Sequence, residues 1–177
     1  MIETARLILR PWEDRDRAPF HDMCRDPQVM ATLGPLMTRE QSDLLVDRVI
    51  GFQRELGYTF WALQRREDGA FLGFCGLKPG ALDTPIEGQV EIGWRLGSAH
   101  WGKGYAREAA QASLDWAWDH LNVAAVMAIT ARVNSRSWGL MERLGMQRLA
   151  ELDFDHPQVP PDSHLRPHIV YRADRPA

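Results

Sequence analysis

The feature that most constrains the fold is a strand, a glycine-rich loop and a helix that follow one another in mid-chain. Val90–Leu96 alternates in character as a strand does. The loop reads Trp101-Gly102-Lys103-Gly104-Tyr105-Ala106, and an apolar stripe predicts a helix over about 105–121. Glycines let a backbone approach an anion closely, and a helix start offers unpaired N–H groups and a positive dipole end. The segment therefore predicts a phosphate-binding site.

Two common phosphate-binding motifs do not match this loop. A P-loop needs a serine or threonine directly after its lysine, whereas Lys103 is followed by Gly104. A dinucleotide-binding loop needs a glycine where this chain has Arg107. From the loop alone, a plain strand-to-helix turn that binds no ligand stays open as an alternative.

Strand and helix patterns are mixed along the rest of the chain, with no linker or repeat between them. Thr38 and Gln41 resemble a capping box at the start of a helix over about 39–56, and Asp68-Gly69 indicates a hairpin. Further strands are predicted at Leu7–Leu9, Tyr58–Leu63, Phe71–Leu77, Ala125–Ala131, Met146–Leu152 and Ile169–Arg172, with a loop at Asp153–Pro167. The length of 177 residues favours one domain, a mixed α/β (α+β) fold with a central mixed sheet flanked by helices.

The composition argues against several classes of protein. A formal net charge of −3 argues against general nucleic-acid binding, which usually shows a basic excess. Cys24 and Cys75 lack a C-x-x-C spacing, so neither a disulfide framework nor a zinc ribbon is predicted. The N-terminus has no signal-peptide pattern, and no segment approaches the roughly 18 apolar residues that span a bilayer. We therefore expect a cytoplasmic protein that binds neither nucleic acid nor a membrane.

Four blocks of sequence resemble the GNAT superfamily of N-acetyltransferases, and its RimJ/RimL-like branch in particular. The loop is similar to the family's Q/R-x-x-G-x-G/A motif, with Trp101 in the Q/R position as a departure. The segment 134–146 resembles the family's N-x-x-S followed by a helix that ends in L-G-M. The segment 4–12 resembles the T-x-R-L-x-L-R-P of the branch, and Phe154–Pro157 with His168 and Tyr171 is also seen in its members. The resemblance spans nearly the whole chain.

The resemblance implies one N-acetyltransferase domain over residues 1–177. Its sheet would be mostly antiparallel, with Val90–Leu96 and Ala125–Ala131 as a parallel pair that splays apart. Acetyl-CoA, the implied co-substrate, would lie in the gap with its pyrophosphate on the amides of the loop. The residues implied to contact it are Ile92, Gly93, Trp94, Arg95 and Leu96 of the strand, Trp101, Gly102, Lys103, Gly104, Tyr105 and Ala106 of the loop, and Asn134 and Ser137.

Two residues are candidates for proton transfer in the attack of an amine on the thioester. Glu91 is the candidate general base, because it lies on the strand beside the expected thioester. Ser137 resembles the family serine near the thioester sulfur and is the candidate acid for the departing thiolate. A surface ion pair of Glu91 with an arginine, a hydroxyl of Ser137 bonded to its own backbone, and a water chain as base stay open as alternatives. Asn134 could contact coenzyme A, cap a helix, or do both.

The acceptor is expected to be an amine of a protein N-terminus or a small molecule, with Trp61, Asp155 and His156 as candidates to contact it. No metal is expected, because the spacing of His156, His164 and His168 fits no zinc pattern. A homodimer is expected by resemblance only. Two alternatives to an N-acyltransferase stay open: a non-catalytic acyl-CoA-binding regulatory module and a plain phosphate-binding domain.

Overall fold

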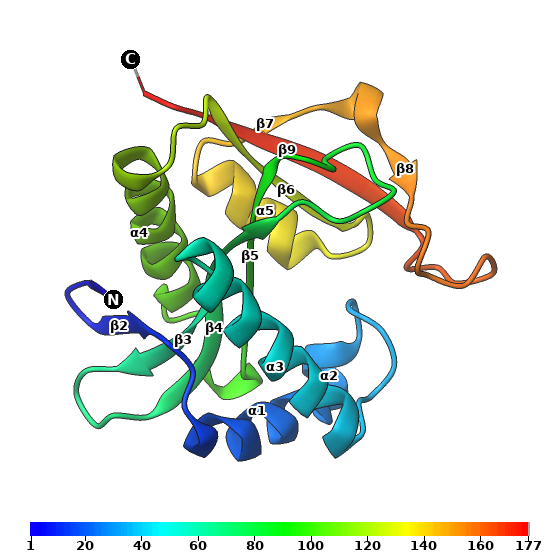
Figure 1. Ribbon diagram of the computed structural model, residues 1–177. Coiled ribbons are helices and arrows are strands. Elements are labelled where there is room, and N and C mark those ends of the chain that lie inside the picture. Colours follow the sequence, from blue (N-terminus) through cyan, green and yellow to red (C-terminus); the bar gives the residue numbers. More distant parts are fainter. Residues whose placement is uncertain (177) are drawn as a thin grey trace.

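The protein folds around a single sheet with helices on both faces (Figure 1). The computed structural model describes residues 1–176, and within them nine strands form the order β1-β2-β3-β4-β5-β6-β9-β7, with β8 paired to β9. All neighbours are antiparallel except β5 and β6, which are parallel, so the expected mixed and mostly antiparallel sheet is confirmed. The strands are β1 (Ile2–Glu3), β2 (Leu7–Arg10), β3 (Phe60–Arg65), β4 (Phe71–Pro79), β5 (Val90–Leu96), β6 (Ala125–Ala131), β7 (Gln147–Arg148), β8 (Phe154–Asp155) and β9 (Pro167–Asp174).

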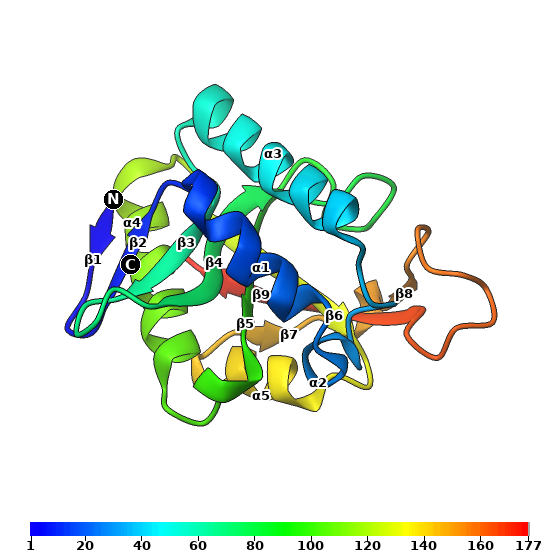
Figure 2. The ribbon, with the colours of Figure 1, turned by 90° about the horizontal axis from the view of Figure 1, so that it is seen from below.

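The helices divide between the two faces of the sheet (Figures 1 and 2). Helices α1, α2 and α3 share one apolar cluster with β3, and α4 and α5 share another with β4, β5 and β6. The helices are α1 (Arg17–Cys24), α2 (Pro27–Met30), α3 (Arg39–Leu56), α4 (Tyr105–His120) and α5 (Ser135–Arg143), with short 3-10 turns at Asp14–Asp16, Ser98–His100 and Ala150–Leu152. No helix within residues 1–176 combines the length and the apolar character that crossing a bilayer would take.

Local signals predicted α3 correctly at both ends. The Thr38 hydroxyl accepts from the N–H of Gln41, and the Gln41 side chain accepts from the N–H of Thr38, so both halves of the capping box are present. Gly57 follows the helix in the left-handed conformation, with φ of 79°. The bounds of this helix therefore follow from short-range hydrogen bonds alone.

Several predicted segments differ from the structure, and β4 and β9 are longer than the strands expected there. The strand expected at Tyr58–Leu63 begins two residues later, as β3. The prediction of a strand at Met146–Leu152 is correct only for β7 (Gln147–Arg148), because the chain forms a 3-10 turn at Ala150–Leu152 instead. The loop expected at Asp153–Pro167 contains β8, which pairs with β9. Each difference lies where sheet pairing, rather than local pattern, decides the end of a strand.

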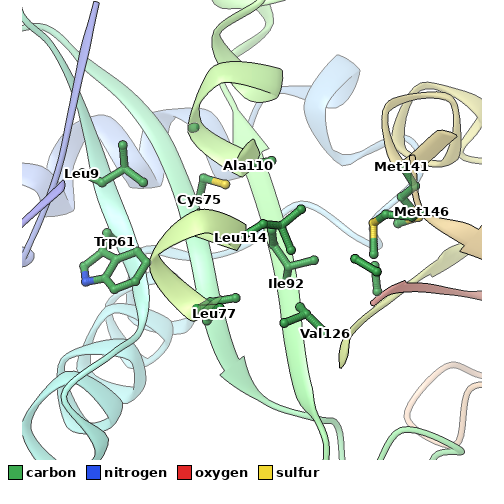
Figure 3. Close-up of a cluster of buried hydrophobic side chains, with 14 of the residues drawn as sticks. Leu9, Trp61, Cys75, Leu77, Ile92, Ala110, Leu114, Val126, Met141 and Met146 are labelled. Atoms are coloured by element: carbon green, nitrogen blue, oxygen red, sulfur yellow. The ribbon is translucent and has the colours of Figure 1, made fainter. Parts of the chain in front are cut away.

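The main core lies between the sheet and helix α4. Figure 3 shows Leu114 of α4 beside Ile92 of β5, and both side chains are buried. Small residues on α4 let this helix approach the sheet closely, because Ala109, Ala110 and Ala117 are fully buried. The packing holds β5 and the N-terminus of α4 in a defined geometry, and both of these elements carry predicted site residues.

The parallel strands β5 and β6 separate soon after they meet. Within the described residues they pair at one position, Glu91 with Met127. On its other side β5 pairs with β4 along its whole length, and β6 pairs likewise with β9. The edge of β5 that faces β6 is therefore left without a strand partner beyond Glu91. The predicted splayed pair is confirmed.

Candidate active site

The glycine-rich loop presents free backbone N–H groups at the start of α4. Gly102 and Gly104 have φ of 73° and 82°, a left-handed conformation that side chains disfavour. None of the N–H groups from Gly102 to Ala106 donates a hydrogen bond to another described residue. Gly102, Lys103 and Gly104 are exposed. The loop can therefore accept an anion on several amides at the positive end of a helix of 16 residues.

Arg6, in the N-terminal segment, holds the glycine-rich loop in place through contacts with the loop and with the first turn of α4. Arg6 forms an ion pair with Glu108 in the first turn of α4, with 2.7 Å between Nε and Oε2. The same guanidinium donates to the carbonyl oxygen of Lys103 at 2.9 Å and lies over the ring of Tyr105. Sequence reasoning did not assign a role to Arg6 or Glu108. Their positions are 102 residues apart, so no local pattern could have linked them.

Trp101 explains how the loop tolerates its departure from the family motif. Its indole N–H donates to the carbonyl oxygen of Leu96 at 2.8 Å, which ties the loop to the end of β5. The guanidinium of Arg136, on α5, lies 4.5 Å from the centre of the Trp101 ring. This cation–π contact joins the loop to the start of α5.

The residues of β5 point alternately to the two faces of the sheet. Ile92 and Leu96 are buried in the α4 cluster, with Trp94 packed against it. Gly93 lies under Phe60, whose ring would be 2.8 Å from an added Cβ atom. Arg95 lies near Phe20 and Phe74 and contacts the Cys24 sulfur at 3.2 Å. Only the backbone of β5 therefore faces the gap toward β6.

Asn134 and Ser137 meet at the N-terminus of α5. The Asn134 side-chain oxygen accepts from the N–H of Ser137 at 3.3 Å, so Asn134 caps this helix. Ser137 is half-buried, and its hydroxyl makes no hydrogen bond with another described residue. The alternative interpretation, in which the Ser137 hydroxyl bonds to its own backbone, is therefore not what the structure shows.

Glu91 is buried at the closed end of the gap and is paired with a lysine. Its carboxylate accepts a hydrogen bond from Nζ of Lys78, the facing residue on β4. Burial raises the pKa of Glu91, and the positive charge of Lys78 opposes this effect. The expected alternative, a surface pair with an arginine, is therefore wrong in both its partner and its exposure.

A pocket of about 310 Å³ lies beside the separated part of β6. Its walls come from three segments that are far apart in sequence. Strand β6 contributes Ile129–Ala131, the turn after α2 contributes Thr32 and Leu33, and the segment from β8 to β9 contributes His156, Gln158, Val159, Leu165 and His168. Thr32 and Thr130 give it hydroxyl groups, the amide of Gln158 and the two imidazoles are also polar, and the rest of its lining is apolar. The pocket is therefore a place where a second small molecule can approach the gap.

Comparison with known proteins identifies the family of this chain. Residues 6–147 match the family model described as the acetyltransferase (GNAT) domain. The chain belongs to the GNAT acetyltransferase family. It is an acetyl-CoA-dependent acetyltransferase, and two of its relatives are named as uncharacterized N-acetyltransferases, p20 of Bacillus licheniformis and YnaD of Bacillus subtilis.

Relatives and solved structures agree with this assignment. The Bacillus subtilis protein YkkB is 33% identical over 146 residues, which cover 82% of this chain and 84% of YkkB. An acetyltransferase from Agrobacterium tumefaciens superposes with a TM-score of 0.79 at 27% identity, covering 97% of this chain and 92% of that chain. The ribosomal-protein acetyltransferase RimL in complex with coenzyme A has a TM-score of 0.76 at 15% identity, covering 97% and 95%, so that likeness concerns the fold alone.

The acetyltransferase places its three predicted acceptor residues in different surroundings. Trp61 is buried in the main core, where its N–H donates to Gln53 and its ring packs edge-on against Trp116. Asp155 is exposed and lies 3.4 Å from Arg166. Of the three, only His156 lines the pocket. Among the described residues, no group of three or more His, Cys, Asp or Glu side chains is arranged to hold a metal ion.

Proposed function

We propose that this acetyltransferase transfers the acetyl group of acetyl-CoA to a primary amine bound in the pocket beside β6. The observation that carries the proposal is the unpaired edge of β5 between the free amides of the loop and Glu91, which lies across the gap from the part of β6 that lines the pocket. A pantetheine arm can pair with that edge as a strand would, with the pyrophosphate on Gly102–Ala106. The thioester would then lie between β5 and β6, close to the pocket.

The residues near the gap can assist each part of the reaction. The amine nitrogen bonds to the acetyl carbon and loses one proton, while the carbon–sulfur bond breaks with its electron pair on sulfur. N–H groups of β5 that face β6 can donate to the developing oxyanion. We propose that Ser137 donates a proton to the thiolate, because a thiol of pKa about 8.5, by analogy with cysteine, leaves more readily when protonated. Glu91 as the general base stays a prediction.

The pocket favours a small-molecule amine over a protein N-terminus as acceptor. Its volume of about 310 Å³ suits a ligand of modest size, and its walls come from three segments of the chain. We also propose that residues 1–177 act as one N-acetyltransferase domain. The cytoplasmic location and the homodimer stay predictions.

The test is a thermal shift of the purified protein with acetyl-CoA, coenzyme A, ATP or phosphate. A ligand at 100 times its Kd adds about 2.7 kcal/mol of stability, which raises Tm by about 5–10 °C for a domain of this size. We expect this shift with acetyl-CoA and coenzyme A and none with phosphate. Equal shifts with ATP and coenzyme A would instead indicate a plain phosphate site. Binding of acetyl-CoA without turnover of any amine would favour the non-catalytic regulatory module.

A further inference from the structure

Two histidines meet in the wall of the pocket. His156 directly follows β8, and His168 lies on β9 opposite Ala131 of β6. The centres of their rings are 4.7 Å apart, and both side chains are half-buried. Ala131 belongs to the part of β6 that has separated from β5. Strand β6 lies between β9 and the gap, so the two imidazoles line the pocket on the side of β6 away from β5.

Backbone hydrogen bonds assign opposite tautomers to the two rings. Nδ1 of His168 lies 3.0 Å from the carbonyl oxygen of Arg166, which can only accept, so this nitrogen carries the hydrogen. Nε2 of His168 then holds a lone pair. Nδ1 of His156 accepts from the N–H of Gln158 at 3.2 Å, so the hydrogen of His156 is on Nε2. The pocket thus receives one proton acceptor and one donor.

The surroundings keep both rings neutral near neutral pH. Burial lowers the pKa of His156, and positive charge on His168 when it is protonated and on Lys78 lowers it further. Burial also lowers the pKa of His168, against the smaller effect of its bond to the Arg166 carbonyl. The charged side chains placed around the pair are Lys78 of β4, with Glu91 bound to it, and the Asp155–Arg166 ion pair. A neutral imidazole can accept a proton, whereas an imidazolium cannot.

The charge of the pocket limits what it can bind. No carboxylate lines it among the described residues, and its side chains are hydroxyls, an amide, two neutral imidazoles and apolar groups. A polyamine would bury a second ammonium here without an anionic partner, which is costly. An amine with an uncharged and partly apolar body loses less hydration and packs against Leu33 and Leu165.

We propose that Nε2 of His168 is the atom that takes the proton from the acceptor amine, and that the acceptor is a primary monoamine with an uncharged body. His156 donates its Nε2–H to a neutral polar group of that molecule. The proposal rests on the proposed function and names the base and the substrate class of the same site. It assigns the proton to His168 in place of Glu91, which is paired with Lys78 and does not line the pocket.

The step balances with groups already present. The uncharged amine forms a nitrogen–carbon bond to the acetyl group and gives one proton to Nε2 of His168. The carbon–sulfur bond breaks, and the thiolate takes one proton from Ser137, which regains it from water. The imidazolium of His168 releases its proton to water. The products are the N-acetylated amine and the free thiol of coenzyme A.

The test uses acetyl-CoA with 2-phenylethylamine or spermidine as acceptor. His168→Ala is compared with His164→Ala, which removes an exposed histidine of the same segment that does not line the pocket. We expect His168→Ala to lower kcat by about 10²-fold or more, to keep the thermal shift with acetyl-CoA, and to regain activity when imidazole is added. His164→Ala should match the wild type. Spermidine should be turned over more slowly than 2-phenylethylamine.

Several results would overturn the proposal while leaving acetyl-CoA binding intact. One is an unchanged kcat in His168→Ala together with a large fall of kcat in Glu91→Gln. Another is a fall of kcat in His168→Ala that added imidazole does not reverse, because that would indicate a structural role for His168. A wild type that prefers spermidine, or acetylates neither amine, would overturn the substrate class. Long-range ¹H–¹⁵N spectra give a check independent of activity, since a hydrogen on Nε2 of neutral His168 would contradict the assigned tautomer. Loss of the thermal shift in the wild type would instead contradict the proposed function.

Discussion

The half-buried Lys78 and the buried Glu91 form an ion pair at the point where β5 and β6 begin to separate. They face each other across β4 and β5, and 21% and 9% of their side-chain surfaces are exposed. Glu91 also lies opposite Met127, the one position at which the parallel strands pair among the described residues. The pair therefore neutralises a carboxylate that lies deep in the sheet beside the expected thioester.

Replacing Lys78 with methionine should destabilise the protein by leaving that carboxylate buried without a partner. Removing one member of a buried ion pair typically costs about 3–5 kcal/mol. Urea unfolding at pH 8 measures the loss. The matched control is the double variant Lys78→Met with Glu91→Gln, which removes both charges and should recover much of the lost stability. An unchanged free energy of unfolding in the single variant would show that water already solvates the carboxylate.

The same variant should show a distinct dependence on pH. Burial raises the pKa of Glu91, and without Lys78 the pKa should rise further. A raised carboxyl pKa means that the folded state binds the proton more tightly than the unfolded state does. The stability lost in Lys78→Met should therefore shrink as pH falls from 8 through the raised pKa. A loss of stability in Lys78→Met that stays constant from pH 8 down to pH 5 would contradict this account.

Gly104→Ala should weaken binding of acetyl-CoA. The φ of 82° at this position disfavours alanine by about 1–2 kcal/mol, and the added Cβ would lie 3.3 Å from the Arg6 guanidinium. A loop that moves to relieve this strain misplaces its N–H groups, and we expect Kd to rise by about tenfold, or 1.4 kcal/mol. Gly88→Ala is the control, because Gly88 has a φ of 78° and lies outside the loop. Calorimetric titration that finds equal affinities in both variants would contradict the role of the loop.

Asp16→Asn should lower stability through the loss of a bidentate ion pair. Two oxygens of Asp16 accept from Arg10 at 2.7 and 2.8 Å, and the residues are 1% and 7% exposed. The asparagine would leave the Arg10 guanidinium buried without its counter-charge, which should lower the free energy of unfolding by about 3–5 kcal/mol. Asp14→Asn tests an exposed ion pair of the same turn, with Arg17, and should cost under about 1 kcal/mol. Chemical denaturation of both variants compares them directly, and similar losses would rule out the buried pair as the cause.

Ser137→Ala should slow acetyl transfer with little change in stability. If its hydroxyl protonates the departing thiolate, its loss should lower kcat by about 10²-fold, at the low end for general acid catalysis. Asn134 still caps the helix in this variant, because it bonds the N–H of residue 137 and not the hydroxyl. Ser135→Ala, an exposed position on the same helix, serves as control. Steady-state kinetics measure kcat of both variants. An equally small fall of kcat in Ser137→Ala and Ser135→Ala would show that Ser137 acts only as a residue at the start of the helix.

Several features of this protein could be predicted because short-range physics decides them. The capping box at Thr38 and the glycine conformations in the loop depend on backbone angles and hydrogen bonds within a few residues. The alternation in β5 likewise predicted that Glu91 and Ile92 lie on opposite faces. The order of the motifs along the chain was enough to predict the family and the splayed pair.

The tertiary structure decided which distant side chains meet. Arg6 supports the loop through Glu108, Lys78 neutralises Glu91, and His168 joins His156 beside β6. None of these pairings is encoded in a local pattern, because each depends on the register between strands or on how a helix or loop packs against the sheet. The sequence by itself therefore determined most of the elements and the phosphate-binding loop, while tertiary packing and sheet register decided which charges and imidazoles meet.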